Sequence, residues 1–233
     1  MKITLYLSNK KGYQSLLKIL DNIAFKKIIE QVFISKDPGN VEDYYVEIKL
    51  LCVQNNIKVF DRKESNHITT DFSIAIGWRW LIFNVKNLIV IHDSLLPKYR
   101  GFSPLPNMLI NGENYLGATA IYASEEMDEG DIIFQEKVKI NYPLKISEAI
   151  DLVSNLYEII IYKIFFEINN GNNLDGIPQD PYKASYSIWR DTEDYLIDWS
   201  KDADYIKRFV DAVGYPFDGA KTKINNVIIR VLE

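Results

Sequence analysis

The segment Ile91-His92-Asp93-Ser94-Leu95-Leu96-Pro97-Lys98-Tyr99-Arg100-Gly101 joins an apolar run to a loop rich in turn-forming and charged residues. The apolar run, from Leu88 to His92, predicts a buried strand. His92 is one of only two histidines in the 233-residue chain, and an imidazole with an ordinary pKa of about 6.5 suits proton transfer near neutral pH. The segment therefore predicts a strand of a sheet with a reactive group at its end.

Apolar runs that predict strands alternate along the chain with helical apolar spacings. The predicted strands are residues 3–7, 28–34, 57–60, 72–78, 88–92, 118–123 and 132–140, and the predicted helices are residues 13–23, 41–54, 105–110, 146–166 and 203–213. This alternation predicts an α/β fold with a Rossmann-like, mostly parallel sheet flanked by helices.

Ligands of such sheets bind beyond the carboxyl ends of the strands. The segments that follow three predicted strands, residues 8–12, 77–82 and 92–101, carry the polar side chains that a site needs. No G-x-G-x-x-G follows the first strand and no P-loop occurs, so the sequence does not support a nucleotide bound by either motif.

The carboxyl-terminal part differs in composition. Residues 169–181 are mostly polar with two glycines and two prolines, which predicts a linker. We expect a catalytic domain over residues 1–180 and a short α+β subdomain over residues 181–233. The subdomain is predicted to end in a hairpin of residues 220–224 and 227–232, joined across Asn225-Asn226.

Composition excludes several classes of protein. The net charge is −5 without a basic block, which disfavours nucleic acid as a partner, and no apolar stretch is long enough to span a bilayer. The apolar run near the amino terminus, residues 3–7, is too short to be the apolar region of a signal peptide. We therefore expect a cytoplasmic protein without a membrane partner. Neither H-E-x-x-H nor C-x-x-C occurs, and the single cysteine, Cys52, is expected to pack in the core, so no metal site is predicted.

Three further features could belong to a site or be structural. The segment Glu125–Asp131 carries five carboxylates, any of which could return to His92, although a solvated acidic turn is the alternative. Trp78 and Trp80 flank Arg79 after Gly77, and they could stack on a flat heterocycle or cap the core. His67 stands in a polar segment and is predicted to be a loop residue.

The segment from His92 to Gly101 is similar to the H-x-S-L-L-P-x-x-R-G signature of the formyltransferases that use 10-formyltetrahydrofolate. Further motifs follow in the order that this family shows: Asn111-Gly112-Glu113, Gly117-Ala118-Thr119 and Met127-Asp128-Glu129-Gly130-Asp131. Gly77-Trp78 resembles the strand of its folate pocket. Asp198-Trp199 and Tyr215-Pro216-Phe217-Asp218-Gly219-Ala220 resemble the start of the family's C-terminal domain, here in truncated form.

This resemblance implies a role for particular residues. The catalytic histidine and aspartate of the family correspond to His92 and Asp128. The residues that would bind the formyl donor are Gly77, Trp78, Trp80, Leu81, Ile82 and Asp128, and those that would bind the acceptor substrate are Arg79, Ser94, Lys98, Tyr99 and Arg100. The family's third catalytic residue, an asparagine two positions before the histidine, is replaced here by Val90.

The branches of the family differ in the amine that they formylate. The acidic chain, its short tail and its Leu-Pro-Lys-Tyr-Arg-Gly loop look most like the enzymes of sugar nucleotides. The resemblance thus implies transfer to a nucleotide-linked aminodeoxy sugar, in surface polysaccharide (lipopolysaccharide O-antigen) biosynthesis. A homodimer is the assembly that we expect. Two alternatives stay open: formylation of an aminoacyl-tRNA or ribonucleotide, and a protein that binds folate without turnover, which Val90 suggests.

Overall fold

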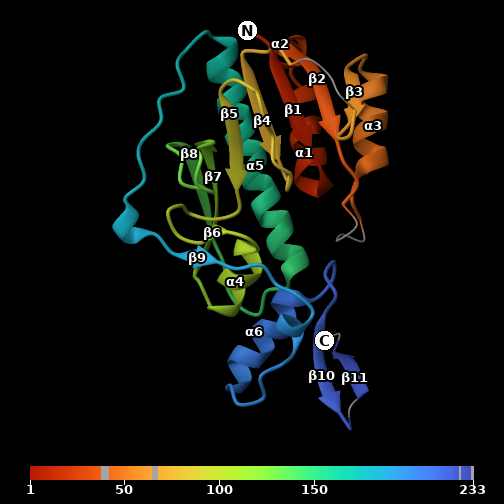
Figure 1. Ribbon diagram of the computed structural model, residues 1–233, viewed down its shortest axis with the longest axis vertical. Helices are drawn as coiled ribbons and strands as arrows, with labels where there is room; N and C mark the ends of the chain where they lie inside the picture. The colour runs from red at the N-terminus through yellow and green to blue at the C-terminus, as the bar shows by residue number, and fades with distance from the viewer. Residues whose placement is uncertain (38–41, 65–67, 226, 232–233) are drawn as a thin grey trace.

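The computed structural model describes residues 1–37, 42–64, 68–225 and 227–231. In these residues one seven-stranded sheet has the order β3-β2-β1-β4-β5-β7-β8 (Figure 1). Its strands are β1 (Ile3–Leu7), β2 (Ile29–Ile34), β3 (Lys58–Asp61), β4 (Phe72–Ile76), β5 (Leu88–His92), β7 (Tyr115–Tyr122) and β8 (Ile132–Lys139). The first five are parallel, whereas β7 runs antiparallel to both β5 and β8. The predicted Rossmann-like, mostly parallel sheet is confirmed.

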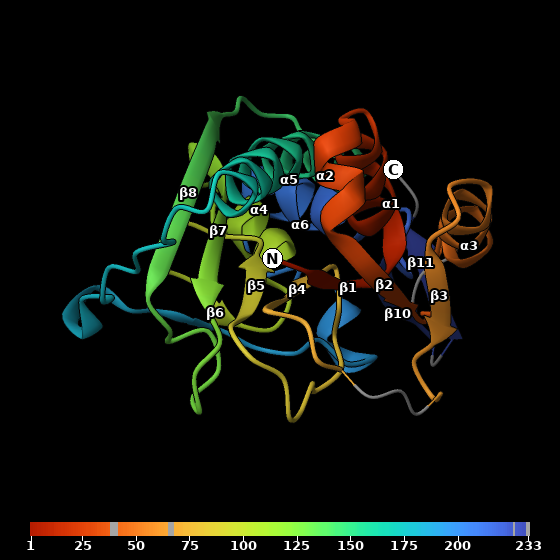
Figure 2. The same cartoon turned by 90° about the horizontal axis from the view of Figure 1, so that it is seen from above.

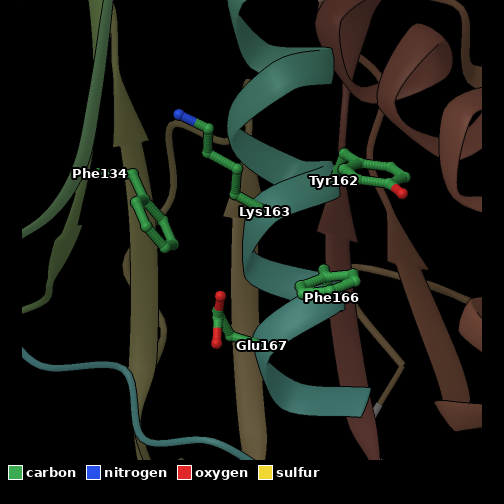
Figure 3. A pocket seen from close by; sticks show the side chains of 5 residues that line it. All are labelled: Phe134, Tyr162, Lys163, Phe166 and Glu167. Atoms are coloured by element: carbon green, nitrogen blue, oxygen red, sulfur yellow. The ribbon is translucent and has the colours of Figure 1, made fainter. Parts of the chain in front are cut away.

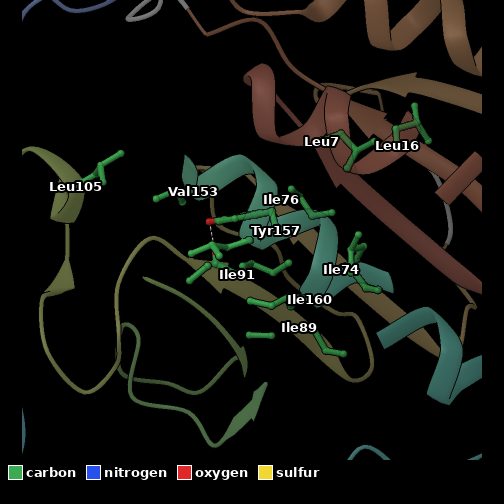
Figure 4. Packing of buried hydrophobic residues seen from close by; sticks show 14 of the residues in the cluster. Leu7, Leu16, Ile74, Ile76, Ile89, Ile91, Leu105, Val153, Tyr157 and Ile160 are labelled. Atoms are coloured by element: carbon green, nitrogen blue, oxygen red, sulfur yellow. Dashed lines mark hydrogen bonds between the residues drawn. The ribbon is translucent and has the colours of Figure 1, made fainter. Parts of the chain in front are cut away.

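Helices cover one face of this sheet. Figure 2 shows α1 (Asn9–Leu20), α2 (Ile23–Ile28) and α5 (Ile146–Asn169) side by side on that face. At the β3 edge, α3 (Tyr45–Gln54) packs on β2, β3 and α1. Alternate residues of the strands point at the helices, because successive side chains of a strand face opposite ways. Figure 4 shows the resulting core, which includes Leu7, Ile74, Ile76, Ile89 and Ile91 of the sheet with Val153, Tyr157 and Ile160 of α5. In the described part of the chain, no helix has the length and apolarity to cross a membrane.

The boundaries of several elements differ from the prediction. The first helix begins at Asn9, although its polar start resembled a loop, because Gly12 lets the helix pack closely on Leu7 of β1. β4 ends at Ile76, before the predicted end at Trp78, because Gly77 has a left-handed φ of +61°. The predicted helix start at Val41 and the predicted loop residue His67 lie outside the described residues.

The segment of residues 169–181, predicted to be a linker, and the residues after it pair with strands of the first domain. Its Ile177 pairs with Ile132 at the start of β8, and further on β9 (Tyr186–Ser187) pairs in parallel with β6 (Arg100–Gly101). Figure 1 shows this segment passing down the side of the molecule from the end of α5 to β9. The segment is thus attached to the first domain at two places.

The carboxyl-terminal residues form a helix and a hairpin. α6 (Ala203–Val213) packs on α4 (Pro104–Ile110), and Arg208 Nε donates to the Ile110 carbonyl at 3.1 Å. The predicted hairpin is confirmed as β10 (Ala220–Ile224) and β11 (Val227–Val231), which pair antiparallel.

Tyr157 anchors α5 to the end of β5. Its ring is 1% exposed, and its hydroxyl shares one proton between the Ile91 carbonyl at 2.7 Å and Asp93 Oδ1 at 2.6 Å. Asp93 also forms an ion pair with Lys11 of α1. Burial opposes the ionisation of Asp93, yet the Lys11 ammonium and the Tyr157 hydroxyl hold its pKa below the usual value. Helices α1 and α5 are thereby both tied to the residue next to His92.

We predict that Tyr157→Phe lowers the free energy of unfolding by about 1–3 kcal/mol, because the buried Ile91 carbonyl and the Asp93 carboxylate each lose a hydrogen bond from the Tyr157 hydroxyl. Urea denaturation measures this. The control is Tyr162→Phe on the same helix, whose side chain is 42% exposed, and it should change stability by less than about 0.5 kcal/mol. Equal effects of the two changes would contradict the anchoring role.

Candidate active site

The candidate site lies where β1, β4 and β5 end. In the sheet order, β1 has β2 on one side and β4 on the other, so the chain reverses its direction of winding there. Ligands of open parallel sheets bind at such a point, outside the carboxyl ends of the strands. Three segments leave this edge: residues 8–12, 77–87 and 93–99.

His92 and Asp128 meet at this edge. His92 is the last residue of β5, and its Nδ1 lies 3.5 Å from Asp128 Oδ2. Both side chains are nearly buried, with 8% and 11% exposed. Asp128 lies between β7 and β8, with a left-handed φ of +59°, and its Oδ2 also accepts a hydrogen bond from Gly101 N at 2.9 Å. Of the five carboxylates in that loop, Asp128 is thus the one that returns to His92.

The hydrogen bonds of His92 indicate which ring nitrogen can exchange a proton. Nε2 lies 2.7 Å from the Tyr99 carbonyl oxygen. A carbonyl only accepts, so Nε2 must carry a hydrogen and donate it. The other nitrogen, Nδ1, faces the Asp128 carboxylate and is free to gain or lose the second proton. The pair can therefore transfer a proton at Nδ1 while the ring orientation stays fixed by Tyr99.

The loop after His92 is held in shape by polar side chains beneath it. Ser94 is fully buried, and its Oγ donates to the Lys98 carbonyl at 2.6 Å. Thr119 Oγ1 donates to the Ser94 carbonyl at 2.6 Å, and Gln135 Nε2 donates to the Leu96 carbonyl at 3.0 Å. The Ser94 hydroxyl, predicted to bind substrate, is thus used inside the loop.

Two other predicted substrate-binding residues are also engaged within the protein. The Tyr99 hydroxyl bonds Glu113 Oε1 at 2.8 Å, and burial raises the pKa of Tyr99 to about 12. Arg100 is 3% exposed, and its guanidinium contacts Glu129 at 2.7 Å and Gln179 at 2.9 Å. Both side chains serve to fix loops around the site.

The remaining two predicted cations reach solvent. Lys98 is exposed. The Arg79 side chain is 42% exposed, with Nη1 2.9 Å from Asp37 Oδ1 and its guanidinium carbon 5.2 Å from the centre of the Trp189 ring. Arg79 and Lys98 are therefore the cations of the predicted set that a charged substrate can approach.

The second face of the sheet, on which His92 lies, is apolar beside the histidine. Phe33, Tyr6, Ala75 and Val90 stand in register across four neighbouring strands, and the Tyr6 and Phe33 rings stack at 5.1 Å. Sequence analysis missed Tyr6, although its place between Leu5 and Leu7 in the first strand marks it as pointing to this face. Val90 thus sits in an apolar row on the same face as His92.

The segment after β4 packs on this row. Trp78 and Ile82 contact the cluster around Tyr6, and the Trp78 ring meets Trp80 edge-on at 5.0 Å. Within the described residues, the buried Trp78 Nε1 has no hydrogen-bond partner. Leu81, in contrast, is 77% exposed. The predicted donor-binding residues therefore include an apolar wall with one unused hydrogen-bond donor.

Gly77 sets the direction of this segment. The Ser8 hydroxyl and Asn9 Nδ2 both donate to its carbonyl, the latter at 3.0 Å. At φ +61°, an added Cβ would lie 2.5 Å from Asn9 Oδ1 and 2.6 Å from the Ser8 carbonyl oxygen. Only glycine fits where the ends of β1 and β4 approach so closely.

A separate hollow lies on the helical side of the sheet. Figure 3 shows its lining side chains, from β8 and α5: Phe134, Tyr162, Lys163, Phe166 and Glu167. Phe134 is in register with Ile91 through Ala120, so it shares the face of Ile91 and not that of His92. This hollow therefore does not belong to the site. Among the described residues, no group of three His, Cys, Asp or Glu side chains could hold a metal ion.

We predict that Gly77→Ala lowers the free energy of unfolding by about 2 kcal/mol or more, since a left-handed backbone and a collision with Ser8 act together. Gly171→Ala is the matched control, because Gly171 has φ +74° but no atom of the described residues lies within 4 Å of its added Cβ. Urea denaturation of both variants should show a cost near 1 kcal/mol for the control. A Gly77 variant no less stable than the control would refute the close approach.

Two family models match the chain. One described as "Formyl transferase" matches residues 68–151, and one described as "Formyl transferase, C-terminal domain" matches residues 190–233. The methionyl-tRNA formyltransferase of Ureaplasma parvum serovar 3 is 31% identical over 202 residues, 81% of this chain and 66% of that enzyme. The corresponding enzyme of Coprothermobacter proteolyticus is 34% identical over 71% of this chain and 53% of its own. The chain therefore spans 66% or less of the length of these two relatives.

Solved structures agree on the fold. The N-formyltransferase from Helicobacter canadensis, in complex with folinic acid and dTDP-3-aminofucose, superposes with a TM-score of 0.77 at 20% identity, covering 97% of this chain and 85% of that one. The two family models match residues 68–151 and 190–233, and the first of them contains His92 and Asp128. From its sequence and its fold together, this chain belongs to the formyl transferase family.

Proposed function

We propose that this protein transfers a formyl group from 10-formyltetrahydrofolate to the amine of a nucleotide-linked aminodeoxy sugar. The observation that carries the proposal is the His92–Asp128 pair, 3.5 Å apart at the carboxyl end of β5, in a chain of the formyl transferase family. The Helicobacter canadensis enzyme, which has this fold, binds folinic acid and dTDP-3-aminofucose.

The wall beside His92 fits a folate. A pteridine is flat and largely apolar on its faces, and Trp78 offers a partly exposed aromatic ring against which it can pack. Ile82 and Val90, which are partly exposed, continue this apolar surface over the buried Tyr6 ring. Folate would supply the formyl group here, and these residues would exclude water from it.

The reaction needs one proton removed and one delivered. A bond forms between the acceptor nitrogen and the formyl carbon, and the bond from that carbon to the donor nitrogen breaks. The acceptor nitrogen gives up a proton, and the donor nitrogen takes one. His92, protonated at Nδ1, places positive charge beside the formyl oxygen as it becomes negative, and it gives its Nδ1 proton to the donor nitrogen as the old bond breaks. Asp128 accepts the proton that the amine loses and returns it to His92 Nδ1, which restores the pair.

Val90 leaves this site with fewer donors than the family pattern. An amide at that position would offer an N–H to the oxyanion, whereas an isopropyl group offers none. Loss of one such donor costs about a hundredfold to a thousandfold in rate. Stabilisation of the oxyanion by side chains then depends on His92.

The acceptor is proposed from charge. A net charge of −5 disfavours the polyanion tRNA, whereas the half-exposed Arg79 and exposed Lys98 can meet one diphosphate. An aminoacyl-tRNA is the second candidate, since the Ureaplasma and Coprothermobacter relatives are methionyl-tRNA formyltransferases. A role in surface polysaccharide (O-antigen) synthesis would follow from the sugar substrate, and a homodimer is proposed as the assembly.

The first test is formyl transfer itself. With 10-formyltetrahydrofolate and a panel of nucleotide-linked amino sugars, we expect formylated product from one of them, measured by mass spectrometry. His92→Ala should lower kcat at least about a hundredfold, because the charge beside the oxyanion is lost. His67→Ala, the other histidine, is the control and should retain activity. Product from methionyl-tRNA alone would refute the sugar substrate. Folate binding without transfer to any amine would refute catalysis.

Val90→Asn is expected to raise kcat about a hundredfold, since it restores a donor on the face that carries His92. Val90→Ala is the control, as it removes apolar bulk without adding a donor, and it should give no rise. Steady-state kinetics of both variants decide the matter. An unchanged or lower kcat in Val90→Asn would show that this position does not limit the reaction.

A further inference from the structure

The loop that carries Asp128 has no regular structure of its own to fix it. It joins β7 to β8, and Asp128 itself has φ +59°. Two backbone carbonyls of this loop, those of Asp128 and Gly130, both accept hydrogen bonds from Gln179 Nε2, each at 2.8 Å. Gln179 is half-buried and lies in the segment predicted to be a linker, 51 positions after Asp128. Among the described residues of that segment, Gln179 alone donates to these two carbonyls.

Arg100 fixes the orientation of the Gln179 amide. Nε and Nη2 of Arg100 donate to Gln179 Oε1 at 3.1 and 2.9 Å. Because a guanidinium only donates, the amide oxygen must face Arg100 and the NH2 group must face the loop carbonyls. If the Gln179 amide group rotated by half a turn, it would lose its hydrogen bonds to Arg100 and to the two loop carbonyls.

Further contacts close the network around Arg100. Its Nη1 lies 2.7 Å from Glu129 Oε1, in the same loop as Asp128, and the Tyr186 hydroxyl donates to that carboxylate at 2.9 Å. Arg100 is 3% exposed, so its charge is satisfied inside the protein. The next residue, Gly101, donates its backbone N–H to Asp128 Oδ2. One network thus holds both the backbone and the side chain of Asp128.

We propose that Gln179 is a positioning residue for formyl transfer: its amide holds the Asp128 backbone so that the carboxylate faces His92 Nδ1. The inference rests on the proposed function for its chemistry and on the network for its geometry. Arg100 acts in the same way, through Gln179 and Glu129, and not by contact with a substrate. A displacement of a reacting group by about 1 Å can cost a hundredfold in rate.

The test is Gln179→Glu, which keeps the shape and the oxygen that accepts from Arg100 but removes both N–H donors. We expect kcat to fall about tenfold to a hundredfold, with KM for each substrate changed less than about twofold. The matched control is Asn172→Asp, in the same segment, whose exposed amide contacts only Glu167 among the described residues. It should leave kcat unchanged.

Two kinetic outcomes would overturn the proposal. An unchanged kcat would show that the amide donors are not needed, and a change confined to KM would show that Gln179 contacts a substrate. Thermal unfolding of Gln179→Glu within about 2 °C of the wild type separates positioning from a general loss of structure.

A second readout does not depend on activity. The chain has only two histidines, so the His92 ring gives an NMR signal that His92→Ala identifies. We expect this signal to move in Gln179→Glu and to stay in Asn172→Asp, without any substrate. If the wild type transfers no formyl group, the proposed function fails, but this signal still decides the coupling: no movement refutes it.

Discussion

The position of His92 depends on the alternation of side chains along β5. Ile89 and Ile91 face the helices, while Val90 and His92 face the opposite side of the sheet. A shift of the β5 register by one residue would turn His92 into the core and expose the isoleucines, and the free energy of burying those apolar side chains would be lost. Hydrogen-bonded pairing with β4 and β7, and the bond from Tyr157 to the Ile91 carbonyl, prevent that shift.

The same register also builds the loop beyond His92. His92, Thr119 and Gln135 stand side by side on β5, β7 and β8, so the two polar side chains lie under the loop and bond its carbonyls. The loop needs no regular structure, because buried donors take up its carbonyls. The Ser94 hydroxyl bonds the Lys98 carbonyl inside the loop, and the Tyr99 hydroxyl bonds Glu113, so these residues of a binding motif hold the loop in shape.

Val90 changes the character of the site more than its loss of one amide suggests. It continues the apolar row of Phe33, Tyr6 and Ala75, and Trp78 packs over that row. A drier surface strengthens the electrostatic effect of each remaining polar group, since screening by water is reduced. Catalysis therefore depends more strongly on the His92–Asp128 pair, and so on the hydrogen bonds that hold Asp128 in place.

The sequence by itself determined the strands, most of the helices, the parallel sheet, the terminal hairpin and the place of His92, because these follow from local periodicity and turn residues. A motif also identified Asp128 among five carboxylates, where periodicity could not. Only the tertiary structure showed that Arg100 turns inward and that the polar segment predicted to be a linker supplies Gln179. Such contacts join residues 79 and 51 positions apart, and no local pattern encodes a distance between them. They arise because the packed sheet brings β6, the β7–β8 loop and the segment after α5 together.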